Sequence, residues 1–332
     1  MAKNLKDTDY LFISTYLRAR EKNILTAAGM DRMIEAPTAD DAAKVLQEIG
    51  YGEFSASSDS QLNAALTRER ENMFADLYRF VPDKAVVDVF KVKYDYHNTK
   101  AMIKAAAMGL DGKRLLMDAG RIPAEKLAEA VMEGEFDRLP GTLGAAARQA
   151  SEVLSATGDP QLSDFVLDRA YYAEMLAAAK ATGSDFLVDY VRVSIDSANL
   201  RSAVRTLRMK KGGEFLEKVL FEGGTVSLSS IIDAAFSGEV AEPFAVSALR
   251  AAAELGAEAV QGGSLTRFEK ACDDAVTAFA TKAKGVSFGV EAVIGYLVAK
   301  EIEFTAVRII MSSRMAGISG DIIRERLREA YV

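Results

Sequence analysis

One arrangement of residues recurs three times along the chain, each time in a segment with a helical pattern. An acid is followed three positions later by Asn, or by Ala in the last copy, and five positions later by a base: Asp95-Tyr-His-Asn98-Thr-Lys100, Asp196-Ser-Ala-Asn199-Leu-Arg201 and Glu303-Phe-Thr-Ala306-Val-Arg308. The copies lie about a hundred residues apart. Two further landmarks share this offset: residues 120–127 match 224–231, and residues 162–165 match 265–268. We therefore predict one helical unit that is used three times.

The composition favours helices and a substantial core. The 332 residues are 49% hydrophobic, with 6 prolines and no tryptophan, and strong helix formers dominate. We predict an all-α fold with helical repeat units at residues 1–112, 113–212 and 213–332. Only short turns separate these units, so we expect them to pack closely as one body.

Capping residues and apolar periodicity place the helix ends. Thr38 and Ser58 are expected N-caps, and a break at residues 158–160 precedes a helix expected to start near Ser163. Three longer helices are expected, at residues 84–108, at 184–211, and from after Ser287 to near Gly317. These three helices carry the recurring motif.

Helical geometry separates the motif into two polar sides. The acid and the amide share one face, and the bases lie on roughly the opposite side. The first group is expected to bind neighbouring helices or loop ends within the fold: Asp95, Asn98, Asp196, Asn199 and Glu303. For the bases, two interpretations stay open, a solvated face with weak surface pairs or a lining that binds an acidic partner. These candidate partner-binding residues are Lys100, Lys104, Arg201, Arg205, Arg208 and Arg308. The third copy has fewer of the polar motif residues, with Ala306 in place of Asn and Ser312 in place of the second base.

Charge and cysteine content exclude several classes of protein. A formal charge of −7 disfavours nucleic-acid binding. The single cysteine, Cys272, is expected to be a buried apolar residue in a reducing compartment. The start of the chain, Met1 to Asp7, lacks the apolar stretch of a signal peptide, and the longest apolar region, residues 285–299, is too short for a membrane span.

The residues expected of an enzyme are also missing. With one histidine, multi-histidine metal sites are excluded, and His97 lies on an apolar stripe, where a packed or hydrogen-bonded core histidine is expected. No phosphate-binding glycine loop of a known pattern occurs. The pair Asp273-Asp274 is half of a diphosphate-binding helix motif without its closing acid, and Asp40-Asp41 is explained as first-turn charge. We therefore predict a non-enzymatic protein without cofactor or metal.

The motif segments resemble a known family. Residues 93–100 are similar to a segment of the C subunits of V-type and A-type rotary ATPases, whose eukaryotic members are called d subunits. Residues 16–20, 196–201, 299–303 and 307–308 also resemble that family's segments, in the same order along the chain. The resemblance thus extends over essentially the full length.

The resemblance implies a fold and a function. The fold would be an all-α funnel with three similar subdomains around a pseudo-threefold axis. The funnel would lie on the cytoplasmic side of the membrane, peripheral to it, between the proteolipid ring and a central stalk of coiled-coil D-type and F-type subunits. It would catalyse nothing and would transmit torque between ATP hydrolysis or synthesis and H⁺ or Na⁺ transport.

Two points stay open at this stage. We expect Arg201, Arg205 and Arg208 to face the funnel interior and bind an acidic stalk surface. The alternative function is a free-standing helical-repeat scaffold that binds a peptide or helix, although its repeats would usually be shorter. The identity of the coupling ion and the direction of the reaction are not set by these residues.

Overall fold

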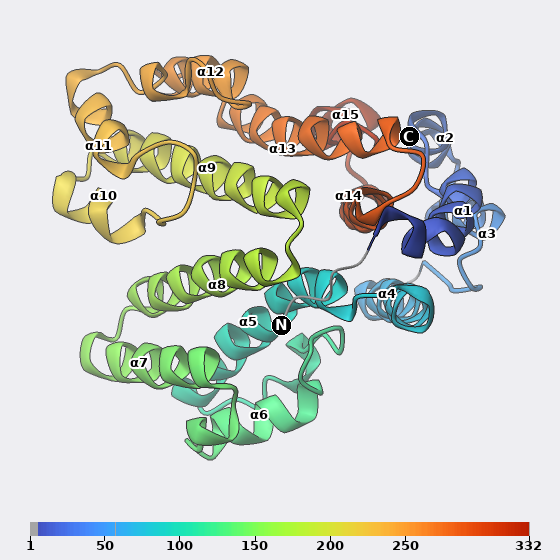
Figure 1. The fold of residues 1–332 in the computed structure, drawn as a ribbon, viewed down its shortest axis with the longest axis horizontal. Coiled ribbons are helices and arrows are strands. Elements are labelled where there is room, and N and C mark those ends of the chain that lie inside the picture. Colours follow the sequence, from blue (N-terminus) through green and yellow to red (C-terminus); the bar gives the residue numbers. More distant parts are fainter. Residues whose placement is uncertain (1–5, 57, 332) are drawn as a thin grey trace.

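Helices form all the regular structure in the part of the chain that the structure describes. The structure is a computed structural model that describes residues 6–56 and 58–331, and within these ranges it contains no β-strand (Figure 1). The predicted all-α class is confirmed. Residues 1–5, which belong to the segment compared above with a signal peptide, lie outside the described residues.

The elements follow one another as short and long helices joined by brief turns. The α-helices are α1 (Leu11–Arg20), α2 (Ala27–Glu35), α3 (Ala39–Glu48), α4 (Asp59–Phe80), α5 (Lys84–Ala107), α6 (Ala124–Met132), α7 (Gly141–Thr157), α8 (Pro160–Thr182), α9 (Asp185–Arg208), α10 (Gly213–Val219), α11 (Leu228–Ser237), α12 (Arg250–Val260), α13 (Leu265–Thr281), α14 (Val290–Met315) and α15 (Gly320–Arg326). Single 3₁₀ turns lie at Asp7–Tyr10, Glu21–Asn23, Lys113–Leu115, Phe136–Arg138, Glu242–Phe244 and Lys282–Gly285.

The capping residues act as their sequence positions predict. The side chain of Thr38 accepts a hydrogen bond from the Asp41 N–H at the start of α3, and Ser58 does the same for Gln61 at the start of α4. The helix expected near Ser163 begins earlier, at Pro160. Proline suits a first helical position because the N–H that it lacks would have no partner there.

Buried hydrophobic side chains form three clusters. Among the described residues, one gathers residues of α5 to α8 and a second gathers residues of α9 to α13. The third joins α1 to α4 with α14, and it also includes the first half of α5, the end of α8 and the start of α9. In Figure 1 the N-terminal helices α1, α2 and α3 lie on the same side of the molecule as the C-terminal helix α14, which packs beside them. The unit boundaries near residues 112 and 212, and the funnel arrangement, stay predictions.

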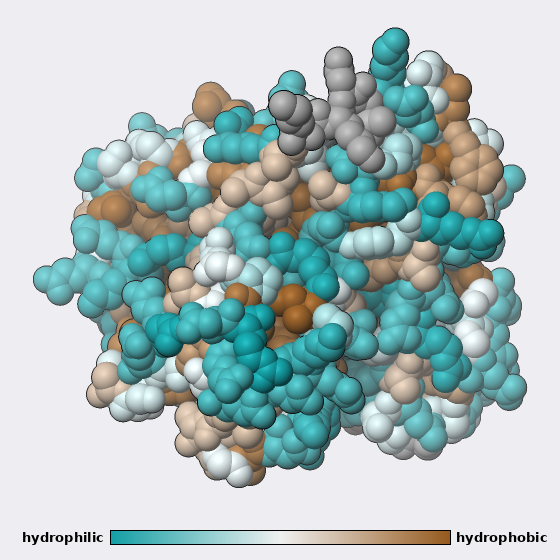
Figure 2. Space-filling model, turned by 60° about the horizontal axis from the view of Figure 1, so that its bottom comes forward, coloured by the Kyte–Doolittle hydropathy of each residue, from teal (hydrophilic) through white to brown (hydrophobic). Residues whose placement is uncertain are grey.

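The surface is largely hydrophilic on the face in view, and the single cysteine is buried. On the face in Figure 2 hydrophilic residues predominate, and hydrophobic side chains form small patches. Cys272 is completely buried, as expected. Across the described ranges, no helix has the length and apolar character needed to span a bilayer.

Candidate functional site

The acids of the first two motif copies bind the backbone of a loop. Asp95 and Asp196 lie in the middle of α5 and α9, with exposed fractions of 0% and 1%. One carboxylate oxygen of Asp95 accepts the N–H groups of Arg121 and Ile122 at 3.0 and 3.2 Å. Asp196 accepts those of Thr225 and Val226 at 3.0 and 3.2 Å. The same side chain therefore anchors the same kind of loop in both units.

Two glycines explain a sequence landmark. A Cβ atom at Gly120 would lie 2.1 Å from a carboxylate oxygen of Asp95, and a Cβ atom at Gly224 would lie 2.1 Å from one of Asp196. Only a residue without a side chain allows the loop backbone to approach the carboxylate so closely. The correspondence of residues 120–127 with 224–231 thus reflects one carboxylate-binding loop.

The motif asparagines hold a second point of each loop. Asn98 donates to the carbonyl of Met117 at 2.9 Å and accepts its N–H at 2.8 Å. Asn199 makes the same pair of bonds with Phe221, both at 2.8 Å. The amide group suits this exchange because it carries one acceptor and one donor side by side. Ala306 cannot make it.

The third acid binds the opposite end of the chain. Glu303 of α14 accepts the Leu25 N–H at 2.8 Å and the Tyr51 hydroxyl at 2.7 Å, and pairs with the Lys300 ammonium at 2.6 Å. Lys300 also pairs with Glu69 of α4 at 2.9 Å. Because Leu25 precedes Glu303 by most of the chain, this contact joins α14 to the N-terminal helices.

Burial sets the electrostatics of these carboxylates. It raises the pKa of Asp95 and that of Asp196 above the ordinary aspartate value, and the hydrogen bonds to each carboxylate oppose this shift. Asp95 also pairs with the Arg121 guanidinium at 2.7 Å. Among the described residues no cation pairs with Asp196, which is held by backbone N–H groups and the Thr225 hydroxyl.

The bases of the first two copies pair with acids on a neighbouring helix. On α5, Lys100 pairs with Asp168 of α8, and Lys104 pairs with Asp164 at 2.7 Å. On α9, the equivalent pairs join Arg201 to Asp273 and Arg205 to Glu269 of α13, the latter at 2.6 Å. Arg208 donates to the carbonyls of Ala259 and Gly263. The two polar sides of each helix therefore contact two different neighbours, and binding of an outside partner by these bases stays a prediction.

Among the described residues, the base of the third copy lacks the ion pair that the bases of the other copies make, although the charge of Asp59 on α4 still acts on Arg308. Ser312 of α14 donates to Asp59 of α4 at 3.4 Å, in the place of the Lys104–Asp164 pair. Arg308 precedes Ser312 by four residues on α14, as Lys100 precedes Lys104 on α5. Asn63 follows Asp59 by four residues on α4, as Asp168 follows Asp164 on α8. Arg308 and Asn63 therefore take the positions of the Lys100–Asp168 pair. Asn63 is neutral, and within residues 6–56 and 58–331 Arg308 makes no ion pair and no hydrogen bond.

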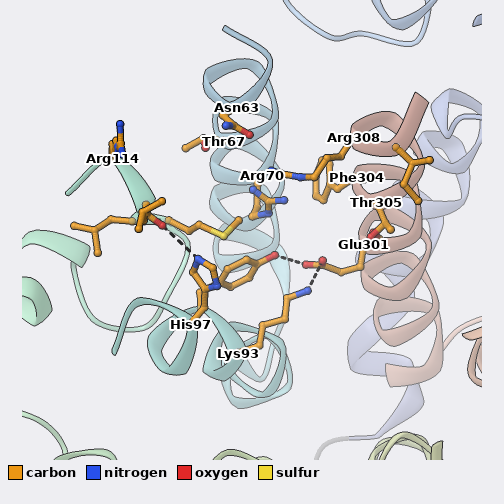
Figure 3. A pocket seen from close by; sticks show the side chains of 15 residues that line it. Asn63, Thr67, Arg70, Lys93, His97, Arg114, Glu301, Phe304, Thr305 and Arg308 are labelled. Atoms are coloured by element: carbon orange, nitrogen blue, oxygen red, sulfur yellow. Dashed lines mark hydrogen bonds and ion pairs between the residues drawn. The ribbon is translucent and has the colours of Figure 1, made fainter. Parts of the chain in front are cut away.

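A pocket opens at this position between α4, α5, α14 and the turn at residues 113–117. Its volume is about 580 Å³ and its wall includes four cationic side chains: Arg70, Lys93, Arg114 and Arg308. Glu301 is the one carboxylate in the wall, where it pairs with Lys93 and accepts the Tyr94 hydroxyl at 2.5 Å. Figure 3 shows Asn63, Thr67 and Arg70 along α4 and Glu301, Phe304 and Arg308 along α14, lining the same space.

His97 differs from its prediction. It was expected in the core, and it is exposed at the wall of the pocket, where its Nε2 lies 3.3 Å from the Leu115 carbonyl oxygen. The apolar stripe on α5 indicated that a neighbouring helix would bury His97. The segment that covers this part of α5 is instead a turn, which leaves the edge of the imidazole exposed.

The structure gives no indication of a metal centre. In the part of the chain described, no three histidine, cysteine or acidic side chains are grouped so that they could hold a metal ion. Asp273 pairs with Arg201 and Arg328, and Asp274 pairs with Lys270. The acid pair noted in the sequence is thus engaged in ion pairs.

Comparisons with known proteins agree on one family. A family model described as "ATP synthase (C/AC39) subunit" matches residues 13–326. The chain is 23% identical over 326 residues to the C subunit of the V-type sodium ATPase of Enterococcus hirae, covering 97% of this chain and 99% of the relative. It is 28% identical over 348 residues to the C subunit of the A-type ATP synthase of Methanocaldococcus jannaschii, covering 96% and 86%. With the C subunit of the V-type ATP synthase of Thermus thermophilus it shares 23% identity, covering 69% of this chain and 77% of the relative.

Proposed function

The chain belongs to the ATP synthase (C/AC39) subunit family, and from this membership we propose that it is the central-rotor subunit that joins the stalk of a V/A-type rotary ATPase to its membrane ring. As a member of this family it is an accessory part of the complex and not the catalytic one. Its role is to transmit torque between ATP hydrolysis or synthesis and ion transport. The observation that carries this proposal is the similarity to C subunits over nearly the full length of the chain.

The contacts within the chain suit a part that transmits force. A socket under torque must keep its helices in fixed relative positions. Buried carboxylates bind loops to α5, α9 and α14, and hydrogen bonds to charged groups contribute about 1.5–3 kcal/mol each. Ion pairs join α5 to α8 and α9 to α13. The packing of the interior further resists deformation.

The proposed partners follow from the position of a socket. One side of the molecule binds coiled-coil stalk subunits of the D and F type, and the other binds the proteolipid ring on the cytoplasmic side of the membrane. The body is arranged as a funnel of three helical units, and the chain is peripheral to the bilayer. The coupling ion belongs to the ring, so H⁺ and Na⁺ are both compatible with this proposal.

The end of α9 offers a surface for the stalk. Arg205 has a side chain that is 54% exposed in spite of its pair with Glu269, and Arg208, Lys210 and Lys211 are exposed beside it. Such a group of cations attracts an acidic surface and orients its approach. We place Arg205 and Arg208 in contact with the stalk. Lys100 and Arg201 are less exposed and pair with Asp168 and Asp273.

The function is tested by isolating the complex. The chain is tagged in its native cell, membranes are solubilised in mild detergent at low salt, and co-eluting proteins are identified by mass spectrometry. Recovery of P-loop ATPase subunits, a coiled-coil stalk protein and a proteolipid in fixed ratio is the expected result. A free monomer, or an unrelated peptide partner, would overturn the rotary role in favour of a helical scaffold.

The stalk surface is tested by charge reversal. Arg205→Glu with Arg208→Glu should weaken binding of the stalk protein and reduce its salt dependence, because attraction between opposite charges becomes repulsion. Arg148→Glu, an exposed base on α7, is the matched control. Unchanged affinity and salt dependence in the double variant would exclude this surface.

A further inference from the structure

The pocket between α4, α5 and α14 carries positive charge in an acidic protein. Four cations and one carboxylate line it, while the whole chain has a formal charge of −7. The carboxylate, Glu301, is already paired with Lys93 and bound by the Tyr94 hydroxyl. Arg70 also lies within reach of the Glu301 charge, but Arg70, Arg114 and Arg308 make no ion pair among the described residues, so the wall keeps an excess of positive charge.

Unpaired charge at Arg308 results from one residue on α4. The equivalent bases Lys100 and Arg201 are paired with Asp168 and Asp273. In the third copy the corresponding position on α4 is Asn63, which lacks the charge. The third copy therefore has the base without the acid that pairs with it in the other two.

Arg70 adds a second cation where the other units have none. When α4 is aligned with α8 and α13 so that Asn63 matches Asp168 and Asp273, Arg70 matches Met175 and Ala280, which are both buried and apolar. Its guanidinium carbon lies over two rings, 4.6 Å from the centroid of Phe304 and 5.3 Å from that of Tyr94. Arg70 is 4% exposed, and its Nε atom is buried without a hydrogen-bond partner. A buried arginine is costly unless its charge is compensated, so this donor indicates a missing acceptor.

The chemistry of the missing acceptor follows from these groups. Planar guanidinium groups donate hydrogen bonds in the geometry that phosphate oxygens accept, and Lys93 and Arg114 add further positive charge at the wall. Apolar side chains of Leu115, Met117 and Ile309 line the same space, and 580 Å³ is within the usual size range of small-molecule sites.

We propose that this pocket binds a phosphate group, held between Arg70 and Arg308, either as free phosphate or as part of a small organic phosphate. Bound there, the phosphate would supply the negative charge that Asn63 does not. It would also connect α4 with α14, the two ends of the chain. This inference goes beyond the rotor function and does not depend on it.

Calorimetric titration of the full chain tests the proposal. The probes are inorganic phosphate and ADP, in chloride buffers of constant ionic strength. Binding of either probe is the expected result. Tighter binding of ADP would identify an organic phosphate as the source, and binding of phosphate alone or equally well would identify free phosphate. If neither probe gives more than the heat of added chloride, the proposal is wrong.

Two variants locate the binding. Asn63→Asp supplies an internal counter-ion to Arg308, and Arg308→Gln removes the cation while keeping a long polar side chain. Each should weaken phosphate binding at least tenfold. Asn63→Asp should also leave the unfolding midpoint equal or higher, because it completes an ion pair, and this separates loss of binding from misfolding. Arg148→Gln, which alters a paired base on α7, is the control. Wild-type affinity in both pocket variants would overturn the proposal.

Discussion

Replacing Glu303 by glutamine should destabilise the contact between the two ends of the chain. The carboxylate is 1% exposed and binds three groups: the Leu25 N–H, the Tyr51 hydroxyl and the Lys300 ammonium. Burial alone would lower the pKa of Lys300, but the charges of Glu303 and Glu69 raise it. The lysine is thus kept charged in the interior chiefly by these two carboxylates.

The size of the effect follows from what the variant leaves behind. Removing one partner of a buried ion pair costs about 3–5 kcal/mol, because the other charge stays buried without compensation. Here Glu69 remains 2.9 Å from the Lys300 ammonium, and the glutamine oxygen can still accept one hydrogen bond. We therefore expect Glu303→Gln to lower the free energy of unfolding by about 2–3 kcal/mol.

Urea unfolding together with hydrogen exchange measures this effect. Because the chain has three cores, the unfolding midpoint is best read alongside local exchange. Exchange should increase in the segment around Leu25, whose N–H loses an ionised acceptor. Glu325→Gln, at an exposed position on α15, is the control and should change stability by less than about 0.5 kcal/mol. An equally small change for Glu303→Gln, with unchanged exchange near Leu25, would show that the carboxylate does not hold the two ends together.

Three further predictions concern other buried groups. Gly224→Ala should cost about 1–3 kcal/mol, because its Cβ would lie 2.1 Å from the Asp196 carboxylate, whereas Gly141→Ala, which has open space, should be nearly neutral in thermal unfolding. Burial raises the pKa of Asp196 in the folded state, so the folded state holds this proton more tightly than the unfolded state does, and the resulting stabilisation is lost as pH rises from about 4 through the folded pKa. The stability of the wild type relative to Asp196→Asn should therefore fall over this pH range. Parallel profiles of stability against pH for the two proteins would contradict this. Burial raises the pKa of Cys272 to about 12, so an aromatic disulfide reagent should label it quickly only in urea, and rapid labelling of the native protein would show that the site opens.

Most of the secondary structure could be predicted because its causes are local. Thr38 and Ser58 bond to N–H groups three residues away, and apolar periodicity over a few turns predicted α5 nearly at its observed bounds. The same locality explains the error at His97. Periodicity marks a face as apolar, but it does not say whether a helix or an open turn covers it.

The candidate site was only partly predictable. The acids and amides were expected to bind within the fold, but their loop partners could not be identified from the motif. Gly120 and Gly224 were the available signal, since each glycine follows a motif acid at a similar distance, 25 and 28 residues, and a glycine allows a close backbone approach. Arg70 gave no signal, because a base within a helix with many charges is usually solvated.

The amino-acid sequence was enough to establish that the chain is helical, that a polar motif recurs on three long helices, and which family the motif resembles. Each of these depends on residues a few positions apart, which a helix brings together whatever the rest of the chain does. Which charges are compensated became visible only in the folded chain. Near Arg201 and Arg205 the sequence shows an excess of bases, and the acids that pair with them lie 72 and 64 residues further on. Arg308 makes no ion pair because chain folding places a neutral residue, Asn63, in the same pocket wall. Charge compensation depends on distance in space, which helix packing sets.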